Sequence, residues 1–88
     1  MNKIEKAIKL IDTNKENISQ ILVSEEFMLK IAKFPSKIKI DVRSVELSKN
    51  DTAEIYFLFG VPLTYSNILT SGAVLVMKNG ENIILKNL

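Results

Sequence analysis

The sequence predicts a single α+β domain of 88 residues, because two periodicities follow one another along the chain. In the N-terminal third, apolar residues recur at the three- and four-residue spacing of amphipathic helices. From Lys37 onward they alternate with polar residues, as in strands that bury one face. Near the C-terminus, Asn79-Gly80 separates two apolar runs, which is a strong hairpin signal. We therefore expect two short N-terminal helices packed on a mostly antiparallel sheet that ends in a type I′ hairpin.

The first helix is predicted from an apolar stripe formed by Ile4, Ala7, Ile8 and Ile11. These positions are spaced i, i+3, i+4 and i+7, so they fall on one side of about three helical turns. The helix is expected to end near residues 12–14, where short polar side chains compete for backbone hydrogen bonds.

A strand followed at once by a helix is predicted for residues 18–34. Residues 18–23 are rich in β-forming side chains, and Ser24 follows them in the position of a helix N-cap. Two glutamates then occupy the first turn, where carboxylates suit the positive end of the helix dipole. Pro35 blocks continuation of the helix. The alternative is a single helix from about residue 17 to residue 34.

The remaining chain is predicted to form strands. Ile38, Ile40 and Val42 alternate with charged residues, but the apolar positions shift by one from Val45, which suggests a β-bulge near Arg43-Ser44. Residues 48–51 have turn chemistry. Residues 53–59 become apolar on both faces, as in a central strand.

The strand of residues 53–59 is expected to break at the Gly-Val-Pro sequence of residues 60–62. A short extension over residues 63–65 and a loop over residues 66–72 should follow. Residues 73–78 and 81–85 then form the predicted hairpin, in a register that places Lys78 opposite Glu81.

Composition argues against catalysis, because the chain has no histidine, cysteine or tryptophan. Histidine is the usual general base near neutral pH, and cysteine and histidine are the usual ligands of transition metals. We therefore expect a non-enzymatic protein without a cofactor or a metal. An enzyme that uses only hydroxyls, lysines and carboxylates is a lower-ranked alternative.

Three features of the sequence predict a cytoplasmic protein. The chain has no cysteine with which to build a secreted disulfide scaffold. Its first residues lack the apolar segment of a signal peptide. Its longest apolar run, residues 73–77, is far shorter than the roughly 20 residues of a membrane span. We expect no membrane contact.

Aromatic residues around the break at residues 60–62 are the best candidates for contacts with another protein. Exposed aromatic side chains often form the centre of protein interfaces, although in strands they are more often core. The predicted partner-binding residues are Tyr56, Leu58, Tyr65, Asn67, Ile68 and Leu69. Edge-to-edge pairing of an exposed C-terminal strand is an alternative mode of binding.

A nucleic-acid-binding module is the alternative function. It would use the densest basic stretch of the chain, which comprises Lys30, Lys33, Lys37, Lys39 and Arg43. Asp41 interrupts this stretch, and no aromatic residue is interleaved to stack on bases. A solvated edge strand, protected by lysines from pairing with other sheets, is the preferred interpretation.

Two segments, residues 21–27 with the helix after them and residues 58–67, resemble the C-terminal region of HK97-type phage major capsid proteins. The similarity rests mainly on Gly60, Pro62 and Ser66, and small uncharacterised phage proteins share this layout. The resemblance implies phage origin and function through protein–protein contacts. We therefore expect a small protein-binding module that contacts a virion component or a host factor, in the host cytoplasm or on the virion. A homo-oligomeric scaffold is a further alternative.

Overall fold

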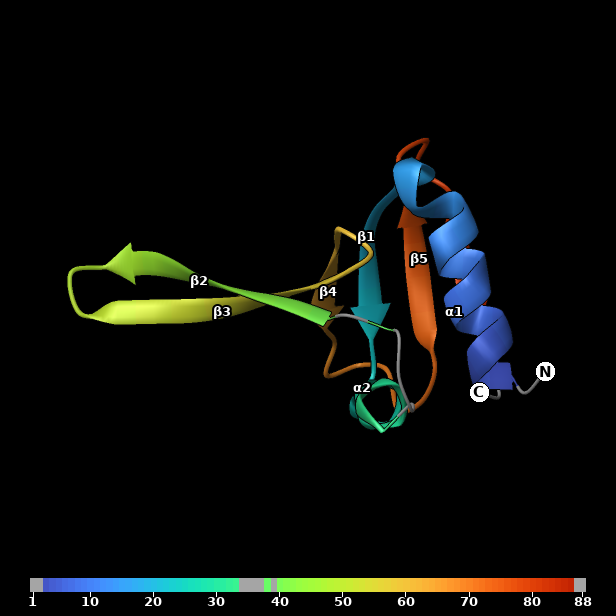
Figure 1. Cartoon of the computed structure of the whole chain (residues 1–88), viewed down its shortest axis with the longest axis horizontal. Coiled ribbons are helices and arrows are strands. Elements are labelled where there is room, and N and C mark those ends of the chain that lie inside the picture. Colours follow the sequence, from blue (N-terminus) through green and yellow to red (C-terminus); the bar gives the residue numbers. More distant parts are fainter. Residues whose placement is uncertain (1–2, 34–37, 39, 87–88) are drawn as a thin grey trace.

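A computed structural model describes residues 3–33, 38 and 40–86 of the chain (Figure 1). It contains two α-helices, one short 3₁₀ helix and six strands in these residues. In chain order the elements are α1 (Lys3–Asn14), η1 (Lys15–Asn17), β1 (Ile18–Val23), α2 (Glu25–Ala32), β2 (Ile40–Ser48), β3 (Asp51–Leu58), β4 (Val61–Tyr65), β5 (Ala73–Met77) and β6 (Asn82–Leu85).

The strands form one sheet in the order β2-β3-β4-β1-β5-β6. β1 and β4 are parallel, and the other neighbouring strands are antiparallel. The predicted α+β class and the mostly antiparallel sheet are therefore confirmed. In the described residues no helix is long and apolar enough to cross a membrane.

The N-terminal half follows its sequence signals closely. α1 buries Ala7, Ile8 and Ile11, as the apolar stripe predicts. The β1–α2 unit also forms, so the alternative of a single helix over residues 17–34 is wrong. β1 is a strand because it lies between β4 and β5 in the sheet, where its backbone groups find partners on both sides.

Ser24 separates β1 from α2 and is itself completely buried. Its hydroxyl accepts a hydrogen bond from the Phe27 N–H at 3.1 Å, so it caps the helix as predicted. The same hydroxyl donates to the Gly72 carbonyl oxygen at 2.8 Å. One side chain thus fixes the start of α2 and the loop before β5.

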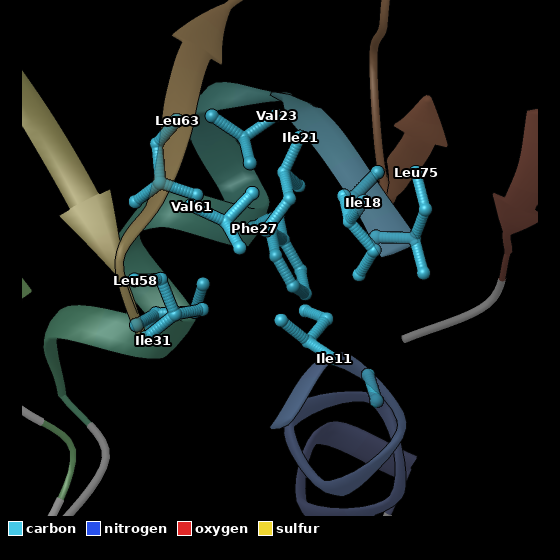
Figure 2. Packing of buried hydrophobic residues seen from close by; sticks show 12 residues of the cluster. Ile11, Ile18, Ile21, Val23, Phe27, Ile31, Leu58, Val61, Leu63 and Leu75 are labelled. Atoms are coloured by element: carbon cyan, nitrogen blue, oxygen red, sulfur yellow. The ribbon is translucent and has the colours of Figure 1, made fainter. Parts of the chain in front are cut away.

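A single hydrophobic core lies on one face of the sheet, which we call the core face. Ile21 of β1 is paired with Leu63 of β4 and with Leu75 of β5, so the three side chains share this face. Both helices contribute to the same cluster, for example through Ile11 and Phe27 (Figure 2). On the opposite face, which we call the open face, no described strand residue belongs to this cluster.

The predicted β-bulge near Arg43-Ser44 is wrong. β2 and β3 pair in a regular register from Ile40 to Glu46, and the irregularity lies between Glu46 and Ser48. The apolar positions shift because β2 carries apolar side chains on both faces. The side chains of β2 therefore alternate regularly between the two faces of the sheet, although the spacing of its apolar residues changes.

β4 begins two residues earlier than predicted and includes Pro62. The turn before it has positive φ at both central residues, 53° at Phe59 and 80° at Gly60, which is the signature of a type I′ turn. Pro62 is tolerated inside the sheet because the parallel pairing with β1 starts only at Leu63. The lack of an N–H on Pro62 therefore breaks none of the paired positions between β1 and β4.

The C-terminal hairpin forms, but its turn is not of type I′. Of Asn79 and Gly80, only Gly80 has a positive φ. The Met77 N–H donates to the Glu81 carbonyl at 2.8 Å, and the Gly80 N–H donates to the Met77 carbonyl at 3.0 Å. These bonds close a three-residue loop, so Met77 and not Lys78 faces Glu81, and the predicted register is wrong.

Candidate functional site

The outer part of the β2–β3 hairpin projects from the body of the protein. β3 is paired with β4 only over residues 56–58, and beyond these it pairs with β2 alone. We call the projecting residues 43–55 the arm. The arm extends along the longest dimension of the molecule, which measures 45 Å (Figure 1). Among the described residues, the arm is thus a two-stranded ribbon to which no third strand is paired, and only its base lies near α2.

The two faces of the arm differ in chemistry. On its open-face side, Val45 and Ile55 are 38% and 36% exposed. At its base on the same side, the Arg43 guanidinium lies over the Phe57 ring, 4.5 Å from the ring centroid. The core-face side carries polar residues instead, among them Glu46 and Glu54. An apolar partner would therefore meet the open-face side of the arm.

A hollow of about 320 Å³ lies on the core face, at the junction between the arm and α2. We call it the tyrosine hollow, after the two phenols that border it. β1, α2, β3 and β4 supply its lining residues, which are Val23, Met28, Glu54, Tyr56, Leu63 and Tyr65. The hollow opens where the cover of α2 ends and the arm begins.

The strand register explains why these residues meet. Tyr56 faces Leu63 across β3 and β4, and Tyr65 faces Val23 across β4 and β1. Continuing the β3–β4 register by two residues brings Glu54 opposite Tyr65 on the same face. Glu54 thus lies between the two tyrosines, next to one along the strand and across from the other.

Charge and burial act on both phenols of the hollow, and a hydrogen bond acts on one of them. The Tyr56 hydroxyl donates to Glu54 Oε2 at 3.0 Å. This bond, followed by the carboxylate charge and burial, raises the pKa of Tyr56 above its ordinary value. Burial, followed by the charge of Glu25, raises the pKa of Tyr65. Both phenols are therefore neutral at physiological pH and border an acidic site.

The predicted partner-binding residues divide between surface and core. Tyr56 and Tyr65 lie together in the tyrosine hollow. Ile68 is 91% exposed, Asn67 is exposed and Leu69 is partly buried. Leu58 is completely buried in the core cluster, so its assignment to a binding surface is wrong.

The loop that carries Ile68 is held next to Tyr65. The Ser66 N–H donates to the Val23 carbonyl at 3.0 Å. The Ile68 N–H donates to the Ser66 hydroxyl at 3.3 Å. An exposed apolar side chain therefore lies in a loop anchored to the strand end that also borders the hollow.

The described basic residues of the nucleic-acid alternative have separate surroundings. Lys30 forms an ion pair with Glu26 at 2.9 Å, and Arg43 lies over Phe57. Lys33 is exposed at the end of α2. Lys37 and Lys39 lie outside the described residues. The contacts of Lys30 and Arg43 are internal to the protein and do not build a phosphate site.

The described part of the chain contains no group of three or more acidic side chains close enough to hold a metal ion. It also contains no buried side-chain nitrogen or oxygen without a hydrogen-bond partner.

Sequence analysis did not predict the arm. The apolar residues on both faces of β2 were its signal, because a strand packed on one side alternates more cleanly.

Comparisons with protein-family models, with curated proteins and with solved structures find no match to this chain. The resemblance to phage capsid proteins therefore stays a prediction. Function has to be argued from the surfaces described above.

Proposed function

We propose that this protein is a non-enzymatic protein-binding module whose contact surface is the open face of the sheet, extended by the arm. The observation that carries the proposal is the apolar character of this uncovered face. The solvated face of an antiparallel sheet usually carries polar residues. Here the open face carries Leu22, Val45, Ile55, Phe57, Val74 and Ile84.

The exposure of these side chains supports a partner. Ile84 is 59% exposed at the β6 edge of the sheet, and Val45 and Ile55 are 38% and 36% exposed on the arm, with the hydrogen-bonded pair Thr64 and Gln20 on the strands between them. Full burial of such a side chain stabilises by about 1.5–3 kcal/mol, so covering the exposed part of each contributes roughly 1 kcal/mol. Several such residues together supply the apolar centre that protein interfaces have.

The arm itself is hard to explain without a binding partner. An isolated two-stranded ribbon is only marginally stable in water, because it has no core of its own. Leu47, near the tip, is 68% exposed and gains nothing from the body of the protein. Residues of this kind are stabilised when a second protein packs against them. The resemblance to phage proteins predicts that this second protein is a virion component or a host factor.

Binding through an apolar face is tested by capture at two salt concentrations. The tagged protein would be incubated with extract of its source cells, washed at low and at high salt, and the retained proteins identified. A Val45→Ser/Ile55→Ser variant removes apolar surface from the arm. Leu29→Ser is the matched control, because Leu29 is 53% exposed but lies on α2.

We expect a protein that survives the high-salt wash with the wild type and with Leu29→Ser, but not with the folded arm variant. A dimer in light scattering that the arm variant dissociates would identify the partner as a second copy. Equal retention by the arm variant, or nothing retained by a monomeric wild type, would contradict the proposal. Nucleic acid retained only at low salt would favour the alternative function.

A further inference from the structure

We infer that the tyrosine hollow binds a basic side chain, that of a lysine or an arginine, presented by the partner protein. The inference deepens the proposed function, because it states the chemistry of one contact with the partner. It rests on a different surface from the proposal above, since the hollow lies on the core face.

The lining of the hollow has the composition that cations prefer. The face of a phenol ring carries negative electrostatic potential and attracts ammonium and guanidinium groups. Tyr56 and Tyr65 supply two such rings, and Met28 adds a polarizable thioether. Val23 and Leu63 provide the apolar surface against which an aliphatic stem packs. None of the described lining residues is basic.

The charge of the site is negative. Tyr56 donates its hydroxyl hydrogen to one carboxylate oxygen of Glu54, which fixes the position of that carboxylate. Glu25 is close enough to Tyr65 to act on its titration. Neither glutamate forms an ion pair with another described residue. An entering cation would thus gain a charge-assisted hydrogen bond from a carboxylate already held in place.

The dimensions of the hollow favour a single side chain. About 320 Å³ is at the lower end of the roughly 300–1,000 Å³ that small-molecule pockets occupy. A neutral apolar group of that size would cover the charged Glu54 carboxylate without bringing an opposite charge to it, which is unfavourable. An anion would meet repulsion from the two glutamates. A basic side chain satisfies both the apolar lining and the charge.

A pair of peptides tests the charge requirement directly. The probe is a short capped peptide with one arginine, and its control carries citrulline, which has the same shape without the charge. Titration is followed by NMR at the ring signals of the chain's two tyrosines and the methyl signal of Met28. We expect saturable shifts with the arginine peptide, at millimolar concentration, and at least fivefold weaker binding of the citrulline peptide.

Matched variants locate the binding site. Glu54→Gln should weaken binding of the arginine peptide roughly five- to tenfold, whereas Glu81→Gln, an equal change of charge in the C-terminal hairpin, should leave it unchanged. Tyr65→Leu should weaken it similarly, and Tyr65→Phe, which keeps the ring, should not. Tyr65 is 55% exposed, so both variants are expected to fold.

Two results would overturn the inference. Equal binding of arginine and citrulline peptides would show that the hollow accepts any side chain of that shape. No shift of the tyrosine or Met28 signals, up to tens of millimolar peptide, would show that it accepts none. The Val45→Ser/Ile55→Ser variant separates this outcome from failure of the proposed function, because it leaves the hollow intact and should bind the arginine peptide like the wild type.

Discussion

Replacing Ser24 by alanine removes two buried hydrogen bonds and provides a direct test of the fold. The Ser24 hydroxyl accepts from the Phe27 N–H and donates to the Gly72 carbonyl. In the alanine variant the N–H of Phe27 loses this partner, and Phe27 is only 1% exposed. The Gly72 carbonyl keeps one donor, because the Ser24 N–H also bonds to it at 3.2 Å.

The two losses set the expected magnitude. Removal of a serine N-cap typically costs about 1 kcal/mol. Loss of a second buried hydrogen bond, with the acceptor still partly satisfied, costs about another 1 kcal/mol. The Ser24→Ala variant should therefore lose roughly 2 kcal/mol of unfolding free energy. This is a large share of the roughly 4–13 kcal/mol expected for a domain of this length.

Urea denaturation followed by circular dichroism measures this loss. The midpoint should move to lower urea at an unchanged slope, and Tm should fall by about 8–16 °C. Ser66→Ala is the matched control, since its hydroxyl accepts one long bond, 3.3 Å, at an exposed position. It should cost no more than about 0.5 kcal/mol. A Ser24→Ala loss as small as that of the control would refute the role assigned to Ser24.

Two further predictions concern backbone geometry and titration. Gly72 and Gly80 both have positive φ, but a Cβ on Gly72 would overlap a β6 carbonyl, whereas a Cβ on Gly80 would meet open space. The Gly72→Ala variant should therefore lower the urea midpoint far more than Gly80→Ala. The raised pKa of Tyr56 means that the stability contributed by its hydrogen bond to Glu54 is present below pH 10 and is lost as pH rises through the raised pKa. Glu54→Gln should accordingly lower the midpoint of that tyrosine's absorbance titration toward its ordinary value, and an unchanged midpoint would contradict the assignment.

Elements with strong local signals were predictable from sequence. The buried stripe of α1 and the N-cap at Ser24 follow from spacing and from side-chain chemistry within a few residues. The same holds for the chain reversal between β2 and β3. In each case a local preference and the global fold agree.

The features that sequence analysis missed depend on distant contacts. Phe59 adopts a positive φ, which is unusual for an aromatic residue, and its ring packs against the core cluster while Lys15 Nζ lies 6.0 Å from the ring centroid. The type I′ turn thus forms at Phe59-Gly60, where neighbouring elements hold it, and not at the Asn-Gly pair. Pairing of β1 with β4 is equally non-local.

Sequence analysis predicted only some of the residues that line the tyrosine hollow. The grouping of Tyr56 and Tyr65 around the Gly-Val-Pro break was noted, and both lie in the hollow. Glu54 and Met28 complete it only because the β3–β4 register and the position of α2 bring them there. Leu58 was misassigned for a related reason, since residues two apart share a face of β3, but Leu58 is buried inside the core cluster whereas Tyr56 packs against it and stays partly exposed.

The two proposed contacts lie on opposite faces of the sheet, and their affinities depend on salt to different degrees. Binding at the open face depends on apolar burial, which physiological salt barely weakens. Binding of a basic side chain in the hollow depends in part on Glu54, an exposed charge that is screened over about 8 Å at physiological ionic strength. A partner that grips the arm from both sides should therefore lose only part of its affinity as salt rises, and Glu54→Gln should reduce that salt-dependent part. The remaining affinity belongs to the open face, and the Val45→Ser/Ile55→Ser variant should reduce it at every salt concentration.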